Sequence, residues 1–253
     1  MTTPPVSRYQ QVAEQLREAI TRGDYVPGQR LPGTAVLAEQ YGLSYPTINK
    51  AIRLLATQGL VTVEHGRGTT VRERRTVTQL TQRYVTRQGD GKRGHWTTAT
   101  KQQGFTASQE IRAVETISPP TEIAGYLELD DDSAVIVRRR LLRVDGAPDQ
   151  LADSYYPVII AEGTELADPS TKMRGTTVTA LERLGYVLLR FTEHLEARMP
   201  TAEEYRLLEM SPGTPVLRHI RVTYAEGNQP VEVTETIMTG DRHVMTYELP
   251  AHL

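Results

Sequence analysis

Two short stretches near the start of the chain combine cationic and amide side chains with glycine in a way that suits nucleic-acid contacts. The first stretch is the polar face of a predicted helix. Its candidate residues are Tyr45, Thr47, Asn49, Lys50 and Arg53. The second is a predicted hairpin tip, with candidates His65, Gly66, Arg67 and Gly68. Amide side chains can pair with base edges, and cationic side chains contact phosphates.

Each of these residues also has a purely structural interpretation, which the sequence leaves open. Tyr45 could pack against the preceding helix, and Asn49 and Lys50 could belong to an ordinary solvated face. Arg67 could be a simple charge at a hairpin tip, and His65 could do no more than end a strand.

The charge of the chain is divided unequally along its length. The net charge is −2 over 253 residues, but residues 1–101 carry 15 basic and 7 acidic residues, which leaves a net −10 for the remainder. A basic front favours a polyanionic partner. The alternative is a solvated linker, because several of these cations cluster in residues 72–93.

Apolar residues in the first seventy positions predict the elements that position this surface. Stripes at three- and four-residue spacing predict helices at about 7–22 and 34–41. Ser44 can cap a third helix, which has the candidate contact residues on its outer face. Its predicted inner face consists of Ile48, Ala51, Ile52 and Leu55.

Residues 60–64 and 69–71 predict a hairpin after the third helix, which completes a winged helix-turn-helix. Ordered motifs run through this region: Tyr9-Gln10-Gln11-Val12, Gly23-Asp24-Tyr25-Val26-Pro27-Gly28, Leu31-Pro32, Leu37-Ala38-Glu39-Gln40-Tyr41-Gly42 and Gly66-Arg67-Gly68-Thr69. With them, the segment 9–71 resembles the DNA-binding domain of the GntR family of bacterial regulators. The resemblance implies that the third helix enters a major groove and that the hairpin reaches a minor groove or phosphates.

The segment departs from the family pattern where DNA is usually contacted. Gly33-Thr34-Ala35 replaces the usual Ser-Glu-Arg after Leu-Pro, and Tyr45 and Asn49 stand where arginines are common. Because asparagine can pair with adenine, we expect an operator that is atypical for the family and leans towards A·T pairs.

Two segments of the remaining chain track each other at a shift of 81 positions. Each begins with a helix-like stretch, at 121–127 and 201–208, and continues as strand, turn and strand. A further helix is expected near 177–184 and a strand near 186–197. This pattern predicts an α+β domain in which helices cover one face of an antiparallel sheet.

Further motifs accompany this repeat: Leu127-Glu128-Leu129, Tyr155-Tyr156-Pro157, Glu196-Ala197-Arg198, Gly227-Asn228-Gln229-Pro230-Val231-Glu232 and Gly240-Asp241-Arg242. They resemble the UTRA domain, the effector-binding module of the HutC branch of the GntR family, which has the chorismate lyase fold. In relatives that sense sugar phosphates, a hydroxyl-rich loop, a hairpin arginine and carboxylates hold the ligand. The positions that match are Trp96, Thr97, Thr98 and Thr100 for the loop, Arg140 for the arginine, Thr176 ahead of a helix and Glu232 for a carboxylate.

This segment also departs from its family. Leu142, Ala152 and Met238 replace a second arginine, a carboxylate and a tyrosine, so we expect a more apolar pocket and name no ligand. Arg140 could instead be a structural ion-pair member, and Glu232 a strand-face charge. Because side chains alternate along a strand, Arg138, Arg139 and Arg140 cannot all enter one pocket.

No enzyme motif is present in the sequence. Nucleophile elbows, phosphate-binding loops and metal-spaced histidines are absent, and there are no cysteines. An enzyme fused to a DNA-binding module is the competing class, but the chain is short for one, and beyond the linker only Lys101 and Lys172 could hold a cofactor. We therefore predict no catalytic, cofactor or metal site. Without a secretion signal or an apolar span, a cytoplasmic location and no membrane partner are expected.

These observations predict a winged helix-turn-helix in residues 1–75, a linker in 76–93 and a UTRA domain in 94–253. The expected function is that of a homodimeric transcriptional regulator. It would bind an inverted-repeat operator in double-stranded DNA and act as a repressor that a small-molecule effector releases. The alternative is a repressor whose degenerate sensor domain serves only for dimerisation.

Overall fold

The computed structural model describes residues 7–64, 66–72, 77–80, 96–170 and 176–247. The chain divides into two compact units, the first formed by residues up to 75 and the second by nearly all residues from 76 onward. Within the described residues, every helix is too short or too polar to cross a bilayer.

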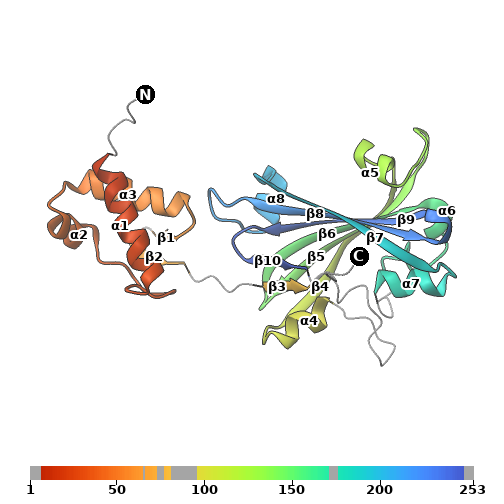
Figure 1. Ribbon diagram of the computed structural model, residues 1–253, viewed down its shortest axis with the longest axis horizontal. Helices are drawn as coiled ribbons and strands as arrows, with labels where there is room; N and C mark the ends of the chain where they lie inside the picture. Colours follow the sequence, from red (N-terminus) through yellow and green to blue (C-terminus); the bar gives the residue numbers. More distant parts are fainter. Residues whose placement is uncertain (1–6, 65, 73–76, 81–95, 171–175, 248–253) are drawn as a thin grey trace, which may run out of the picture. The chain divides into compact units, whose positions relative to one another are not determined.

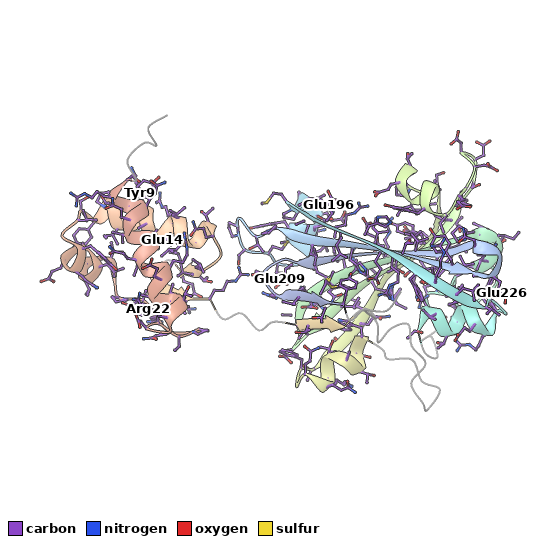
Figure 2. All side chains as sticks on the ribbon, viewed as in Figure 1. Tyr9, Glu14, Arg22, Glu196, Glu209 and Glu226 are labelled. Carbon is purple, nitrogen blue, oxygen red and sulfur yellow. The ribbon has the colours of Figure 1, made fainter. Side chains whose placement is uncertain are left out.

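The first unit is a three-helix bundle with a two-stranded hairpin. Its elements are α1 (Arg8–Arg22), α2 (Thr34–Tyr41), α3 (Tyr45–Thr57), β1 (Val61–Glu64) and β2 (Gly68–Val71). Tyr9, Glu14 and Arg22 lie along α1 (Figure 2). The strands pair antiparallel, from Val61 opposite Val71 to Glu64 opposite Gly68. The winged helix-turn-helix predicted from the sequence is therefore confirmed.

Local signals determine where the helices of the first unit begin and end. The Ser7 backbone N–H donates to the Gln10 side chain at 3.0 Å, which satisfies a free donor at the start of α1. Gly42 ends α2 in the left-handed region at φ +63°, where glycine has no steric penalty. Ser44 is the N-cap of α3, and Pro46 lies in its first turn.

One apolar core holds the first unit together. Leu16, Leu37, Ile48 and Leu55 are almost completely buried and come from all three helices, and Val61 and Val71 extend the core to the hairpin. Burying one face of α3 leaves its opposite face to solvent.

The second unit is built on a six-stranded antiparallel sheet in the order β4-β5-β6-β9-β8-β7. The strands are β4 (Ala107–Ile117), β5 (Val135–Val144), β6 (Ala147–Pro157), β7 (Leu188–Arg198), β8 (Val216–Ala225) and β9 (Pro230–Thr239). The helices are α4 (Trp96–Gln102), α5 (Thr121–Tyr126), α6 (Val158–Ala161), α7 (Thr177–Arg183) and α8 (Ala202–Leu207). An α+β fold was predicted and is confirmed.

The predicted repeat organises this sheet. The hairpins β5-β6 and β8-β9 each follow a short helix, and β6 and β9 pair with each other at the centre. Glu128 and Glu209, which are equivalent in the repeat, follow these helices at φ +54° and +48°. The same strained backbone turn therefore occurs twice.

Helices lie on both faces of the sheet, not on one as we expected. Figure 1 shows α5 and α8 on one side and α4 and α7 on the other. Two apolar clusters explain this arrangement: Ile123 of α5 packs with Tyr155 and Ile220, whereas Leu181 of α7 packs with Tyr156. Tyr155 and Tyr156 are consecutive on β6 and point to opposite faces of the sheet. Both faces therefore carry apolar side chains, and helices bury them on each face.

A second, two-stranded sheet lies partly inside the predicted linker. β3 (Val77–Leu80) pairs in parallel with β10 (His243–Thr246), and Val77 is 2% exposed. At residues 77–80 the structure therefore differs from the sequence-based expectation. A four-residue strand whose partner is distant in the sequence leaves no periodic pattern for sequence analysis to detect.

Candidate functional site

The candidate DNA-contacting residues of α3 lie on the face opposite its core side. Tyr45 is 56% exposed, and Asn49, Lys50 and Arg53 are exposed as well, whereas Thr47 is half-buried. Lys50 and Arg53 form no ion pair with any other described residue. Their charges therefore remain available to a polyanion.

Two hydrogen bonds order the polar face of α3. The Thr34 hydroxyl at the start of α2 donates to Asn49 Oδ1 at 3.3 Å. The hydroxyls of Ser44 and Thr47 lie 2.9 Å apart. Thr34 and Asn49 are both departures from the family pattern, and the structure brings them together.

The tip of the β1-β2 hairpin presents one exposed cation. Gly66 and Gly68 have φ values of +75° and +98°, which favour glycine. Arg67 between them is 77% exposed and lies 3.7 Å from Glu64, a contact that is worth little in water. His65 lies outside the described residues.

A cavity of about 740 Å³ lies within the second unit. Its lining comes from the sheet, α4 and α7, and comprises Trp96, Thr97, Lys101, Ala107, Ser108, Gln109, Ile111, Arg140, Leu142, Gln150, Ala152, Ser170, Thr176, Thr177, Val178, His219, Arg221, Glu232, Thr234 and Thr236. Hydroxyl, amide and cationic side chains make up most of the lining residues, and Leu142 and Ala152 are among the apolar ones. The expectation of a pocket more apolar than in the sugar-phosphate-sensing relatives stays a prediction.

Five of the seven candidate ligand residues line this cavity: Trp96, Thr97, Arg140, Thr176 and Glu232. The loop that the resemblance implied is instead helix α4. Helical geometry sends Thr98 and Thr100 away from the cavity, so that Thr98 is exposed and Thr100 is buried. Thr176 is the N-cap of α7, where its hydroxyl accepts from the Thr179 N–H at 3.1 Å.

Arg140 is held by neutral groups on the cavity side of the sheet. Its Nε donates to the Ala152 carbonyl at 3.3 Å, and its Nη2 donates to the Ser154 hydroxyl at 2.6 Å. The Ser154 hydroxyl also lies 2.9 Å from that of Thr234. Among the described residues no carboxylate pairs with Arg140, so the structural ion-pair interpretation does not hold there.

The neighbouring arginines alternate as expected. Arg138 is buried, and its Nη1 donates to the carbonyl of Asp168 at 2.9 Å. Arg139 points to the opposite face, where its Nη1 lies 3.5 Å from Asp153 Oδ2.

Glu232 is buried and fixed by two donors, so it is not a solvated strand-face charge. The Tyr156 hydroxyl donates to Oε1 at 2.7 Å, and the Thr223 hydroxyl donates to Oε2 at 3.2 Å. Burial, followed by the negative charge of Glu232, raises the pKa of Tyr156 well above its usual range. Tyr156 therefore stays a neutral donor, and Glu232 presents a preorganised acceptor in the cavity wall.

A second arginine of the cavity lining lies on β8. Arg221 Nη2 lies 2.6 Å from Glu193 Oε1, and His219 Nε2 lies 3.4 Å from the same oxygen. The longer contact is too poorly formed to satisfy the buried Nε2 atom. Burial alone would raise the pKa of Glu193, but His219 and Arg221 outweigh it and lower that pKa to about 2.

Several cavity residues were not predicted from the sequence, notably Lys101, Gln150, His219, Arg221 and Thr236. Alternation along β8 and β9 was the available signal, because Glu232, Thr234 and Thr236 share one face with Arg221 and His219. Using that signal requires knowing which strands are neighbours, which a single sequence does not give.

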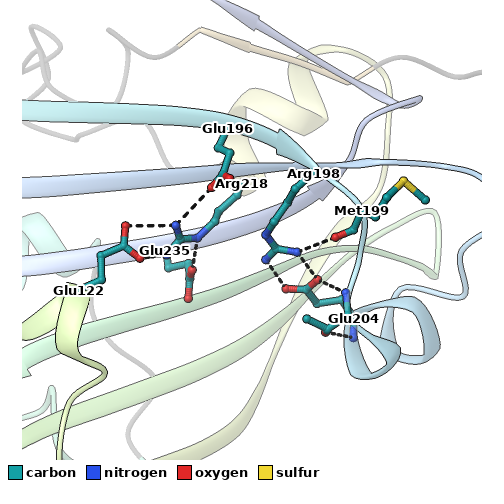
Figure 3. Close-up of polar contacts among 8 residues, drawn as sticks. Glu122, Glu196, Arg198, Met199, Glu204, Arg218 and Glu235 are labelled. Carbon is teal, nitrogen blue, oxygen red and sulfur yellow. Dashed lines mark hydrogen bonds and ion pairs between the residues drawn. The ribbon is translucent and has the colours of Figure 1, made fainter.

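On the face opposite the cavity, Arg218 joins three carboxylates (Figure 3). It contacts Glu235 at 2.6 Å, Glu122 at 2.7 Å and Glu196 at 3.5 Å. These contacts link α5 to β7, β8 and β9. The network lies on the other face of the same strands and fixes α5 to the sheet.

We expect the buried Tyr156–Glu232 bond to appear as non-additivity in a double-mutant cycle. Tyr156→Phe and Glu232→Gln should each lower the free energy of unfolding by about 1–2 kcal/mol, because each removes or weakens a buried hydrogen bond. The double variant should lose about 0.5–1.5 kcal/mol less than the sum of the two. Urea denaturation of the full chain measures this, and strict additivity would contradict the bond.

Comparisons with known proteins agree with this two-part architecture. The family of bacterial regulatory proteins called gntR matches residues 8–71, and the UTRA domain matches residues 102–244. An uncharacterised HTH-type transcriptional regulator of Streptomyces coelicolor is 30% identical over 97% of this chain and 93% of its own. The repressor NagR of Bacillus subtilis is 26% identical over 96% of this chain and 95% of its own. The histidine utilization repressor of Pseudomonas putida is 29% identical, with coverage of 96% and 97%.

Solved structures give the same result. A structure described as a GntR-family transcriptional regulator is 28% identical, with a TM-score of 0.67 over 96% of this chain and 98% of that one. PhnF of Mycobacterium smegmatis, at 24% identity and a TM-score of 0.59 over 95% of this chain and 100% of its own, shares the fold. The relatives named above are described as regulators or repressors and not as enzymes. The chain therefore belongs to the GntR family of bacterial transcriptional regulators, in the HutC branch, which joins a winged helix to a UTRA domain.

Proposed function

We propose that the chain represses transcription by binding an inverted-repeat operator as a homodimer, and that a small molecule in the cavity releases it. The observation that carries this proposal is the exposed face of α3, which presents Asn49, Lys50 and Arg53. Arg67 of the hairpin is exposed in the same GntR domain. The names of two relatives, NagR and the histidine utilization repressor, support repression. Two-fold symmetry of a helix-turn-helix dimer favours a palindromic site.

In this proposal the DNA-binding domain spans residues 1–75, residues 76–93 connect it and residues 94–253 bind the effector. Tyr45, Thr47, Asn49, Lys50, Arg53 and the hairpin residues 65–68 contact DNA. The cytoplasm is the compartment in which such a protein would meet its operator.

The effector is a small polar molecule. The cavity volume of about 740 Å³ suits a metabolite-sized ligand. Arg140 has no carboxylate partner among the described residues, and the Glu232 carboxylate is already oriented, so Arg140 offers a cationic donor and Glu232 an anionic acceptor. Trp96, Thr97 and Thr176 complete the contacts from α4 and the start of α7.

Fluorescence anisotropy with duplexes selected from a random pool tests DNA binding. Tight binding that survives excess random duplex supports sequence-specific recognition, whereas binding no tighter than to random duplex contradicts it. Recovery of the family's usual guanine-centred half-site would contradict an A·T-leaning operator.

The same assay, run with a metabolite panel, tests release. A compound that lowers affinity in the wild type but not in Arg140→Ala supports an effector in this cavity. If no compound alters affinity or thermal stability, the domain serves only for dimerisation.

Asn49→Ala and Arg67→Ala should have different effects on binding. Loss of Asn49 should reduce the preference for the correct base at one base pair, with a loss of about 1–3 kcal/mol in the free energy that separates it from a wrong base. Loss of Arg67 should weaken binding to all duplexes. The slope of affinity against salt concentration should then correspond to about one fewer counterion released on binding. Repeating the selection and the salt titration with each variant measures both effects. An unchanged selectivity profile for Asn49→Ala would refute its readout role.

A further inference from the structure

β3 is the first strand after the DNA-binding unit in the sequence, and one of its edges is occupied by β10. The two strands pair in parallel, with Val77 opposite His243 and Leu80 opposite Thr246 (Figure 1). The Val77 N–H donates to the Arg242 carbonyl at 2.7 Å. Successive residues of a strand turn their backbone groups to opposite edges, so Thr78 presents its N–H and C=O away from β10.

The side chain of Gln103 occupies that other edge. The Thr78 N–H donates to Gln103 Oε1 at 2.9 Å, and Gln103 Nε2 donates back to the Thr78 carbonyl at 2.9 Å. A glutamine amide carries one acceptor and two donors, so here it replaces the backbone of a neighbouring strand. β3 is therefore bonded on both edges.

Gln103 connects β3 to a wall of the cavity. It follows α4 directly, and its Nε2 also donates to the Ala99 carbonyl of α4 at 3.2 Å. Trp96, Thr97 and Lys101 of the same helix line the cavity. A ligand that moves α4 must therefore move the Gln103 amide or break its bonds to Thr78.

β10 is tied to the same cavity by a buried contact between a histidine and an aspartate. His243 Nε2 lies 3.1 Å from Asp149 Oδ2, and both side chains are at least 97% buried. His243 Nδ1 lies 2.9 Å from the Thr239 carbonyl, so both ring nitrogens face acceptors. Asp149 also accepts a hydrogen bond from Gln150 Nε2 at 3.0 Å, and Gln150 lines the cavity.

We propose that β3 is the strand through which the cavity controls the DNA-binding unit, and that Gln103 is the residue that couples them. Gln103 acts as a positioning residue, because its side chain bonds β3 to α4. The His243–Asp149 pair holds β10 in place. This inference rests on the proposed function, because it assigns the regulation of the same cavity. Occupation of the cavity shifts α4, Gln103 follows, and the affinity of the DNA-binding unit changes with the position of β3.

Coupling between two sites is reciprocal, so DNA binding must change the environment of α4. Trp96 is the only tryptophan of the chain and lies in α4, which makes it a reporter that needs no added label. In the wild type, a duplex selected as described above should alter acrylamide quenching of Trp96. Gln103→Ala should still bind the duplex, and the alteration should be lost. Gln229→Ala, an exposed glutamine of the β8-β9 turn, is the matched control and should behave as the wild type.

Hydrogen exchange tests the link between α4 and β3 through Gln103 without DNA. Gln103→Ala should speed amide exchange in the peptide that contains residues 77–80 by about 2- to 10-fold, because Thr78 loses one hydrogen-bond acceptor. Thr97→Phe, which fills part of the cavity from α4, should change exchange in the same peptide only while Gln103 is present. Gln103→Glu keeps the acceptor but loses the donor, so its exchange rate should lie between those of wild type and Gln103→Ala.

The outcomes separate the two proposals. If the wild type binds DNA tightly with unchanged Trp96 quenching, or if Gln103→Ala retains the full response, the coupling role is wrong and the proposed function stands. If no duplex binds, the proposed function fails, and the exchange data still decide whether Thr97→Phe reaches β3 through Gln103. An effect of Thr97→Phe that persists in Gln103→Ala would overturn that route.

Discussion

Leu55→Ala is expected to lower the free energy of unfolding of the first unit by about 2–5 kcal/mol, and with it to remove most DNA binding near physiological temperature. Leu55 is fully buried on the inner face of α3 and packs in the core that joins the helices to the hairpin. A domain of this size has a total stability of only roughly 3–10 kcal/mol. Losing the side chain therefore unfolds a large fraction of the molecules, and the contact face of α3 is lost with the helix.

Thermal and urea unfolding followed by circular dichroism measure the loss, and Trp96 fluorescence reports on the second unit alone. We expect the Trp96 transition to be unchanged in Leu55→Ala. Val26→Ala is the control, because Val26 is 53% exposed and its truncation should change stability by less than about 0.5 kcal/mol. A Trp96 transition that moves together with that of the first unit would contradict independent unfolding of the two units.

The helices of the first unit were predictable because two local signals agreed. The apolar stripe located α3, and Ser44 located its start. Gly42 at φ +63° marked the end of α2. Periodicity and capping depend on residues within one or two turns, which a single sequence displays in full.

Long-range pairing explains what the sequence did not predict. β3 and β10 form a parallel pair of four residues each, with 162 residues between them in the sequence, so neither has a turn or a partner nearby. The edge strand β4 mixes exposed and half-buried positions and gives no clean alternation. The resemblance implied a loop at Trp96–Thr100, where threonines have weak helix propensity, but the structure has α4 there.

The cavity was predictable only where a motif could be carried over. Arg140 and Glu232 were identified in that way and line the cavity. Their partners Ser154 and Tyr156 become apparent only from the pairing of β5, β6 and β9. Strand register depends on contacts across the whole sheet, and it determines which side chains meet.

Asp153→Asn is expected to raise the free energy of unfolding of the second unit near neutral pH by up to about 3 kcal/mol, and to leave it unchanged in acid. Burial raises the pKa of Asp153 from 3.8 to about 6, although Arg139 opposes the rise. Arg139 Nη1 is 3.5 Å from the carboxyl, and Glu235, its register partner on β9, adds repulsion. The ion pair with Arg139 therefore does not offset the free-energy cost of burying the Asp153 carboxylate.

The direction of the pH dependence follows from this shift. Because the folded-state pKa lies above the unfolded value, the folded state binds more protons between pH 3.8 and about 6. The stability due to this carboxyl is fully present below pH 3.8 and is lost as the pH rises through about 6. Asparagine has no charge to bury, so the variant escapes this loss.

Urea denaturation of wild type and Asp153→Asn at several pH values measures the difference in the free energy of unfolding, which should grow between pH 3.8 and about 6 and then level off.

Glu193 has the opposite pH dependence, because its pKa is lowered from 4.5 to about 2. Its contribution to the free energy of unfolding is lost only as the pH falls from 4.5 through about 2. Glu115→Gln removes an exposed partner of the same Arg139 and should show no such pH dependence. A stability difference for Asp153→Asn that stays constant across this pH range would mean that Asp153 keeps an ordinary pKa and that its pair with Arg139 does offset burial.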